Sequence, residues 1–207
     1  DSKEFEDHPE KIKERLDKVA GVIVPGGFGS SGVEGKIAAI KYCREQKIPF
    51  MGICYGLQLA VIEHARNIIG LTDANSTEIN PKTKNPVVAV LPEQEALLAK
   101  QQYGNTMRLG DYQADLQKGS IIASLYKSEK ALERHRHRYE VNPDFVEQLE
   151  TKGLVFSGRS PDHKLVEFLE RDDHPYFVGT QAHPEFTSRP MQPQQLFYWL
   201  IKAALEK

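Results

Sequence analysis

The chain has 207 residues, of which 27 are basic and 29 acidic, giving a formal net charge of −2. This length suffices for one compact domain, and we expect residues 1–207 to form a single one. The balanced charge contains no basic stripe, which argues against nucleic-acid binding. No apolar run approaches the ~18 residues that a membrane-spanning helix needs, so we expect no membrane segment.

The start of the chain and the cysteines bear on the compartment. The chain starts with charged residues, without an initiator Met or a signal-peptide core, so we expect the natural protein to start elsewhere. Cys43 lies in a helical pattern and Cys54 follows a predicted strand, which argues against a disulfide between them. We therefore expect a reducing compartment, the cytosol. The pattern Asn75-Ser76-Thr77 would not be glycosylated there.

The first part of the chain predicts alternating helices and strands. Apolar residues at helical spacing indicate helices, and short apolar runs bounded by Gly or Pro indicate buried strands. The predicted elements are a helix over 8–19, a strand over 21–24, a helix over 33–47, a strand over 48–53 and a helix over 57–69. A strand, helix, strand and helix of these lengths predict a parallel βαβ unit.

The rest of the chain predicts shorter strands and a final helix. The predicted strands cover residues 87–91, 106–116, 165–171 and 176–182, a polar irregular stretch covers 92–104, and the last helix covers 194–206. Partial alternation in two of these strands is typical of antiparallel pairing. The whole pattern predicts an α/β fold with a mostly parallel central sheet, helices on both faces and some antiparallel strands.

Residues 51–58 join a predicted strand to a predicted helix and have the pattern G-x-C-x-G, with Cys54 at its centre. This is the cysteine form of a nucleophile elbow, whose tight turn leaves little room for side chains at Gly52 and Gly56. A helix that starts after Cys54 would direct backbone N–H groups at the sulfur and favour the thiolate. The alternative is a buried cysteine in a glycine-rich turn, and the pattern alone does not separate the two.

A His-Pro-Glu triplet follows the last predicted strand. In an extended segment alternate side chains project to the same side, so Glu185 could reach Nδ1 of His183. Nε2 would then be free to take the proton from Cys54, and these three residues form the predicted catalytic triad. The alternative is a surface turn with an incidental His-x-Glu, since the chain has 7 histidines.

The glycine-rich segment 25–29 follows the first strand, at the edge where α/β sheets bind ligands. An oxyanion hole needs two donors, and we expect the backbone N–H groups of Gly27 and Tyr55 to supply them. A phosphate-binding loop is the competing interpretation. It fails because Gly35-Lys36 is followed by Ile37 rather than by Ser or Thr.

In this order the elbow, the Gly-Gly loop and the His-Pro-Glu triplet resemble the triad (class I) glutamine amidotransferases. Residues 74–78, 104–110, 133–142 and 183–190 narrow the resemblance to the glutaminase domains of the CTP synthase family. The resemblance implies a flavodoxin-like class I fold, hydrolysis of L-glutamine at Cys54, and transfer of ammonia to an N-terminal synthase domain absent from this chain.

The same resemblance implies further partners. The synthase domain would use ATP and Mg²⁺ to aminate UTP to CTP, GTP would act as an allosteric activator, and the intact enzyme would be a homo-oligomer. The glutaminase part itself would need no cofactor and no metal. The irregular segment 92–110 is the candidate contact with the synthase domain, and an ordinary surface loop is its alternative.

At positions that match the family, the chain offers partners for glutamine. Glu78 can pair with the substrate ammonium, Arg138 can hold its carboxylate, and Gln58, one helical turn after the nucleophile, can position either group. Gly27 and Tyr55 would contact the substrate from the oxyanion hole.

Two other interpretations exist for the basic segment that contains Arg138. Residues 134–138 could be a solvated basic run. A zinc site on His135 and His137 would lack further ligands.

The chain also departs from the family. Tyr55 replaces the usual Leu, Asn105 replaces the usual Gly, and only 24 residues precede Pro25, where the family has additional strand and helix elements. Two alternatives to the CTP synthase interpretation stay open. One is another class I amidotransferase or a γ-glutamyl hydrolase with the same triad, and the other is a non-catalytic regulatory module with a vestigial triad.

Overall fold

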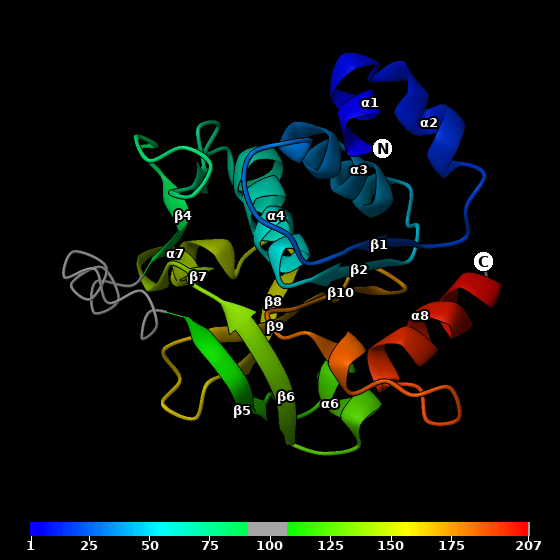
Figure 1. Cartoon of the computed structure of the whole chain (residues 1–207), viewed down its shortest axis with the longest axis vertical. Helices are drawn as coiled ribbons and strands as arrows, with labels where there is room; N and C mark the ends of the chain where they lie inside the picture. The colour runs from blue at the N-terminus through cyan, green and yellow to red at the C-terminus, as the bar shows by residue number, and fades with distance from the viewer. Residues whose placement is uncertain (91–106, 207) are drawn as a thin grey trace.

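The computed structural model describes residues 1–90 and 107–206 (Figure 1). The helices are α1 (Ser2–Asp7), α2 (Glu10–Leu16), α3 (Val33–Glu45), α4 (Tyr55–His64) with the π-helix η1 (Ala65–Ile69), α6 (Ile121–Tyr126), α7 (Pro143–Leu149), the 3-10 helix η3 (Pro184–Phe186) and α8 (Gln195–Leu205). The strands are β1 (Val22–Val24), β2 (Phe50–Ile53), β3 (Asn75–Ser76), β4 (Pro86–Val90), β5 (Arg108–Leu116), β6 (Lys130–His137), β7 (Tyr139–Val141), β8 (Leu154–Arg159), β9 (Val166–Arg171) and β10 (Phe177–Thr180). None of these described helices is long and apolar enough to cross a membrane.

The main sheet of the described chain has the strand order β1-β2-β10-β9-β8-β5-β6. In Figure 1, α3 and α4 lie on one side of β1, β2 and β10, and α6 and α8 lie on the other. The predicted α/β class with helices on both faces is therefore confirmed. The predicted βαβ unit is also present, since β1 pairs in parallel with β2.

The sheet is less parallel than predicted. β2 also pairs in parallel with β10, but the pairs β10–β9, β9–β8, β8–β5 and β5–β6 are antiparallel. The physical reason lies in the connections. A parallel crossover needs about a dozen residues or more, and the segments 160–165 and 172–176 that join β8 to β9 and β9 to β10 are shorter.

The parallel strands β2 and β10 are buried on both faces, whereas Ile23 of the edge strand β1 is exposed. All four residues of β2 are buried. Phe50 and Phe177, with ring centroids 4.5 Å apart, face the core beneath α3 and α4, whereas Met51 and Val178 face the core beneath α8. Because successive strand residues point to opposite faces, β2 and β10 bury both faces, as their short apolar runs predicted.

A second described sheet, β3-β4-β7, was not predicted except for β4. The chain leaves the main sheet after β6 and enters this smaller sheet at β7, with Arg138 between the two strands. Glu78 follows β3 in the same small sheet. Two short strands of two and three residues carry too little pattern to be predicted, yet Glu78 and Arg138, two predicted substrate-binding residues, lie next to them.

Candidate active site

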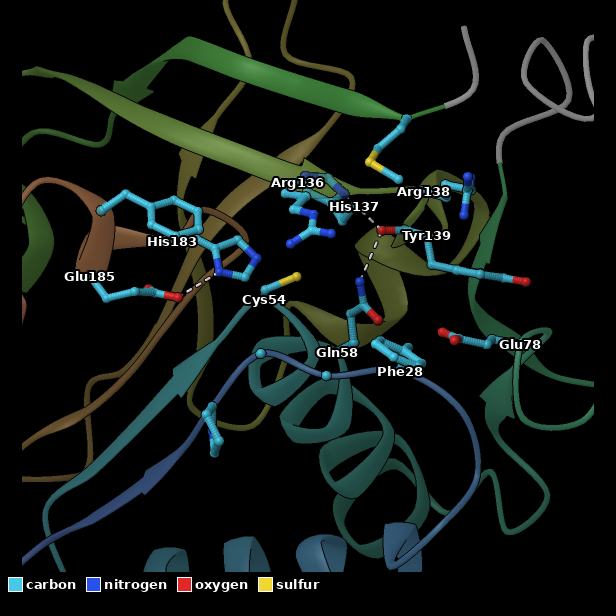
Figure 2. Close-up of a pocket in the computed structure, with 15 residues that line it drawn as sticks. Phe28, Cys54, Gln58, Glu78, Arg136, His137, Arg138, Tyr139, His183 and Glu185 are labelled. Atoms are coloured by element: carbon cyan, nitrogen blue, oxygen red, sulfur yellow. Dashed lines mark hydrogen bonds and ion pairs between the residues drawn. The ribbon is translucent and has the colours of Figure 1, made fainter. Parts of the chain in front are cut away.

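The predicted site residues converge on a cavity of about 580 Å³ (Figure 2). Its described lining includes the predicted residues Gly27, Cys54, Gln58, Glu78, Arg138, His183 and Glu185. They follow the carboxyl ends of β1, β2 and β10 or come from the smaller sheet. The eighth predicted residue, Tyr55, turns its side chain into the core, so only its backbone is a candidate for the site.

Cys54 lies between β2 and α4 with a φ of 50° and a ψ of −99°, the strained backbone expected of a nucleophile elbow. The glycines around it are required sterically. A Cβ on Gly56 would overlap the Val24 carbonyl oxygen, and one on Gly52 would lie 2.7 Å from the Gly56 carbonyl group. The prediction that this turn excludes side chains at both positions is confirmed.

The sulfur of Cys54 is buried, and burial raises the pKa of its thiol to about 12. The backbone N–H of Tyr55 at the start of α4 favours the thiolate, as predicted, but Glu140 and Glu185 oppose it. Desolvation outweighs the helix amide, so the folded chain favours the thiol over the thiolate.

His183 and Glu185 form a hydrogen bond of 2.7 Å, in which Nδ1 of the imidazole donates to Oε1 of the carboxylate. Nε2 of His183 is buried without a hydrogen-bond partner among the described residues, and Figure 2 shows the ring beside Cys54. We had expected this segment to be extended, and that expectation was wrong. Pro184 starts the 3-10 helix η3. A tight 3-10 turn brings Glu185 back to His183 instead. Burial acts to raise the pKa of Glu185, but the hydrogen bond with His183 lowers it.

The glycine-rich loop 25–29 is held from several sides. A Cβ on Gly26 would lie 2.7 Å from Cε1 of His183, so the loop backbone packs directly on the imidazole. The Gly29 N–H donates to Oε1 of Glu78 at 2.9 Å, and the Tyr55 hydroxyl donates to the Gly29 carbonyl. The Tyr55 side chain thus places a hydrogen bond on the loop that carries Gly27.

Gln58 points from the first turn of α4 towards the smaller sheet. Its Nε2 donates to the Tyr139 carbonyl at 2.9 Å and to Oε1 of Gln181 at 3.4 Å. The amide is therefore bound to the protein on its donor side. Its predicted role in positioning glutamine stays a prediction.

The basic segment is not a uniformly solvated run. β6 alternates, with His135 and His137 buried and Arg134 and Arg136 exposed, and Arg136 and Arg138 line the cavity. Nδ1 of His135 and Nε2 of His137 share a hydrogen bond of 2.9 Å. Within the described ranges, no group of three or more His, Cys, Asp or Glu side chains is placed to hold a metal ion.

A buried ionic network, which the sequence did not predict, lies behind the two histidines. Arg108 donates to Oε1 of Glu140 at 3.3 Å and to Oε1 of Glu167 at 2.7 Å. Burial raises the pKa of Glu140 to about 8 although Arg108 lowers it, and burial lowers the pKa of His135 to about 3. One guanidinium thus bonds to two buried carboxyl groups, of which Glu140 ionises only near pH 8, beside two imidazoles whose pKa values burial lowers.

Sequence reasoning also missed Gln181, whose Nε2 donates to the Cys54 sulfur at 3.7 Å. A signal was available. Parallel strands bring their carboxyl ends to the same edge, and Gln181 directly follows β10, two residues before His183. For Tyr139 and Glu140 no such signal exists, since their place depends on the smaller sheet.

Comparison with known proteins identifies the class to which this fold and site belong. The family model for glutamine amidotransferase class-I matches residues 3–203. Because the match extends over almost the whole chain, the chain belongs to this family.

Within the family, the chain is similar to CTP synthases. It is 54% identical to CTP synthase of Halalkalibacterium halodurans over 198 residues, 96% of this chain and 37% of that protein. It is 55% identical to CTP synthase of Methanocaldococcus jannaschii over 205 residues, 99% of this chain and 37% of that protein. The chain thus spans about 37% of the length of these relatives.

The part of CTP synthase that the chain matches is the glutaminase domain. The structure of the Trypanosoma brucei CTPS glutaminase domain with bound acivicin aligns with a TM-score of 0.92 and 38% identity, over 100% of this chain and 79% of that chain. The resemblance inferred from the motifs, and the class I amidotransferase fold that it implied, are confirmed.

The Arg108 network predicts a pH-dependent stability defect. Breaking a buried ion pair on one side leaves charge uncompensated, so Arg108→Met should lose about 3–5 kcal/mol of unfolding free energy above pH 8. The pKa of Glu140 is raised in the folded state, from 4.5 to about 8. Between these values the folded chain holds more protons than the unfolded chain, so stability falls as pH rises. The Arg108→Met defect should therefore shrink towards pH 5, where Glu140 is neutral.

Urea unfolding at pH 5.5 and pH 8.5 measures this difference. The control is Arg134→Met on β6, since Arg134 is half exposed and the carboxylate it faces, on Asp111, is 3.7 Å away. We expect the control to change stability by less than about 1 kcal/mol at both pH values. An equal loss for Arg108→Met at both pH values would show that the charge of Glu140 is not what Arg108 compensates.

Proposed function

We propose that this chain hydrolyses L-glutamine to glutamate and ammonia through Cys54, His183 and Glu185. The observation that carries the proposal is the joint placement of the three residues. Cys54 sits on a strained elbow in the cavity, and His183 lines the same cavity with a buried Nε2 that has no partner among the described residues and a carboxylate on Nδ1. Nucleophile, base and orienting group are the constellation that acyl transfer needs.

In the first step Nε2 of His183 takes the proton from the Cys54 thiol. The S–H bond breaks, an N–H bond forms, and the sulfur electron pair attacks the side-chain carbonyl carbon of glutamine. The backbone N–H groups of Tyr55 and Gly27 stabilise the resulting oxyanion. Glu185 stabilises the imidazolium through the 2.7 Å hydrogen bond.

The imidazolium then returns its proton to the amide nitrogen, which leaves as ammonia, and a γ-glutamyl thioester remains on Cys54. Nε2 of His183 next accepts a proton from water, which attacks the thioester carbon. The collapse of this second intermediate releases glutamate and regenerates the thiol. No cofactor or metal enters these steps.

Recognition of the amino-acid end of glutamine falls to Glu78 and Arg138, which line the cavity from the smaller sheet and from its junction with β6. Their charges are opposite to those of the substrate ammonium and carboxylate. Gln58, whose amide is held by the Tyr139 carbonyl, helps to position the same end.

We further propose that the ammonia serves a synthase domain that aminates UTP to CTP with ATP and Mg²⁺. The similarity to CTP synthases, of which the chain spans about 37%, supports this use over another amidotransferase or a γ-glutamyl hydrolase. GTP activation, a homo-oligomeric intact enzyme and a cytosolic location belong to the same proposal. The segment proposed to contact the synthase domain, residues 92–110, lies mostly outside the described residues.

The triad predicts one essential thiol. Cys54→Ala should lower glutamate release by several orders of magnitude, because the covalent route is lost. Cys43→Ala is the matched control, since Cys43 is buried in α3 away from the cavity and should leave the rate nearly unchanged. A diazo-ketone glutamine analogue should label Cys54, located by peptide mass spectrometry. Comparable glutamate release from Cys54→Ala would refute the mechanism, and no release from the folded wild-type chain would favour a regulatory module.

The substrate-binding assignment predicts defects in KM. Glu78→Gln keeps an oxygen that can accept from the Gly29 N–H, so it removes the charge without releasing the loop. Loss of one charged hydrogen bond, about 1.5–3 kcal/mol, should raise KM for glutamine about 10- to 100-fold. Arg138→Met should act similarly.

Steady-state glutaminase kinetics measure these changes, with Arg134→Met as the control because Arg134 lies outside the described cavity lining. Normal kinetic constants for both Glu78→Gln and Arg138→Met would mean that the amino-acid end of glutamine binds elsewhere.

Because the proposal assigns glutamine hydrolysis to this chain and UTP amination to a synthase domain, it predicts that this chain alone makes no CTP. Ammonium salt bypasses the glutaminase step, so we would supply UTP, ATP, Mg²⁺ and ammonium chloride with the chain as the only protein, and follow CTP by chromatography. We expect none, because a nucleotide-phosphorylating site requires a phosphate-binding loop that the sequence does not contain in complete form. CTP formation under these conditions would overturn the proposed need for a synthase domain.

A further inference from the structure

Gln181 contacts the nucleophile itself. It is fully buried at the end of β10, its backbone N–H donates to the Glu167 carbonyl at 2.8 Å, and its Nε2 lies 3.7 Å from the Cys54 sulfur. A buried glutamine side chain is costly unless its polar atoms are bonded. Here one of its donors is directed at sulfur, a weak acceptor as a thiol and a much stronger one as a thiolate.

The orientation of this amide is fixed by a neighbouring carbonyl. The Tyr139 carbonyl oxygen can only accept, so the end of Gln58 that faces it at 2.9 Å must be the NH₂ group. The same NH₂ group faces Gln181 at 3.4 Å, so the Gln181 atom there must be its oxygen. The NH₂ group of Gln181 is then left to face Cys54. Figure 2 shows the Gln58–Tyr139 part of this chain of bonds.

We propose that Gln181 is a catalytic residue whose side-chain amide donates to the Cys54 sulfur and stabilises the thiolate during attack on glutamine, with Gln58 and the Tyr139 carbonyl fixing the amide in the donating orientation. The proposal rests on the proposed glutaminase function and adds a residue to it. Gln181 transfers no proton: the proton passes from sulfur to Nε2 of His183, and the amide remains neutral throughout.

The groups around the elbow explain why a hydrogen-bond donor to the Cys54 sulfur matters. Burial, Glu140 and Glu185 all disfavour a negative sulfur, and the Tyr55 N–H and the Gln181 amide are the groups that favour it. A hydrogen bond to the charged form of a buried group is stronger than one to its neutral form. Gln181 therefore lowers the cost of the thiolate without placing a positive charge beside the sulfur.

The test measures the reactivity of Cys54 without requiring turnover. Wild type, Gln181→Met and Gln181→Glu would be treated with iodoacetamide from pH 6 to pH 10, and the adduct at Cys54 quantified by peptide mass spectrometry. Met matches the size of Gln but donates nothing, and an ionised Glu presents only acceptors. At pH 8.5 we expect both variants to react about tenfold more slowly, since one lost bond to a charged group is worth about one pKa unit.

Two comparisons separate this role from a structural one. The Gln181→Glu deficit should shrink as pH falls, because the introduced carboxyl group can again donate to sulfur once it is protonated. Gln58→Met should give a smaller deficit than Gln181→Met. The Gln181 amide is still present in this variant, but without Gln58 it can flip between its two orientations. Gln113→Met on β5 is the matched control, because the Gln113 side chain donates to Asp115 and lies outside the described cavity lining. It should react like wild type.

Wild-type reactivity in both Gln181 variants would overturn the proposal. A deficit at pH 8.5 in Gln181→Met but not in Gln181→Glu would also overturn it, because such a difference would come from side-chain volume alone. Circular dichroism establishes that each variant is folded, and if Gln181→Met does not fold, the pH dependence of Gln181→Glu decides. A chain that released no glutamate would contradict the proposed function but would leave this alkylation test valid. The two failures are therefore distinguishable.

Discussion

The close approach of Gly56 to the Val24 carbonyl is the contact that holds the site together. A Cβ at Gly56 would overlap that oxygen, so α4 can begin against the end of β1 only with glycine there. This contact places Cys54 beside the loop that follows β1, and the parallel pairing of β2 with β10 places Gln181 and His183 on its other side. The strained backbone of Cys54 is held by packing on both sides.

Burial is the second constraint, and it acts against the nucleophile. The same packing that forms the elbow removes water from the sulfur and raises its pKa to about 12. Helix position alone does not offset this cost, so in the proposed mechanism the thiolate forms only when His183 takes the proton. Neutral donors such as the Tyr55 N–H and the Gln181 amide suit a site of this kind, because they stabilise the transient charge without a buried counterion that would itself need compensation.

The smaller sheet makes the two sides of the cavity chemically different. On the side of the main sheet lie the sulfur, the imidazole and the Glu185 carboxylate, and on the other side lie Glu78 and Arg138. Arg138 stands where the chain passes from β6 to β7, and the Tyr139 carbonyl that follows it orients Gln58. Behind this junction Arg108 bonds to Glu140 and Glu167, so a network outside the cavity holds β7, the strand that follows the proposed substrate-binding residue Arg138.

Local sequence patterns were sufficient for the G-x-C-x-G turn, the strand β1, the buried strands β2 and β10, and the α/β class. These follow from short-range sterics and periodicity, which a chain of residues displays directly. The same patterns indicated antiparallel strands at β5 and β9 but did not reveal β6, β8, the strand order, the short strands β3 and β7, the 3-10 turn at Glu185 or the protonation of Cys54. Strand order depends on which distant segments pair, the two- and three-residue strands exist only through their partners, and a pKa depends on burial. Each of these is a property of neighbours that the chain brings together only when it is folded.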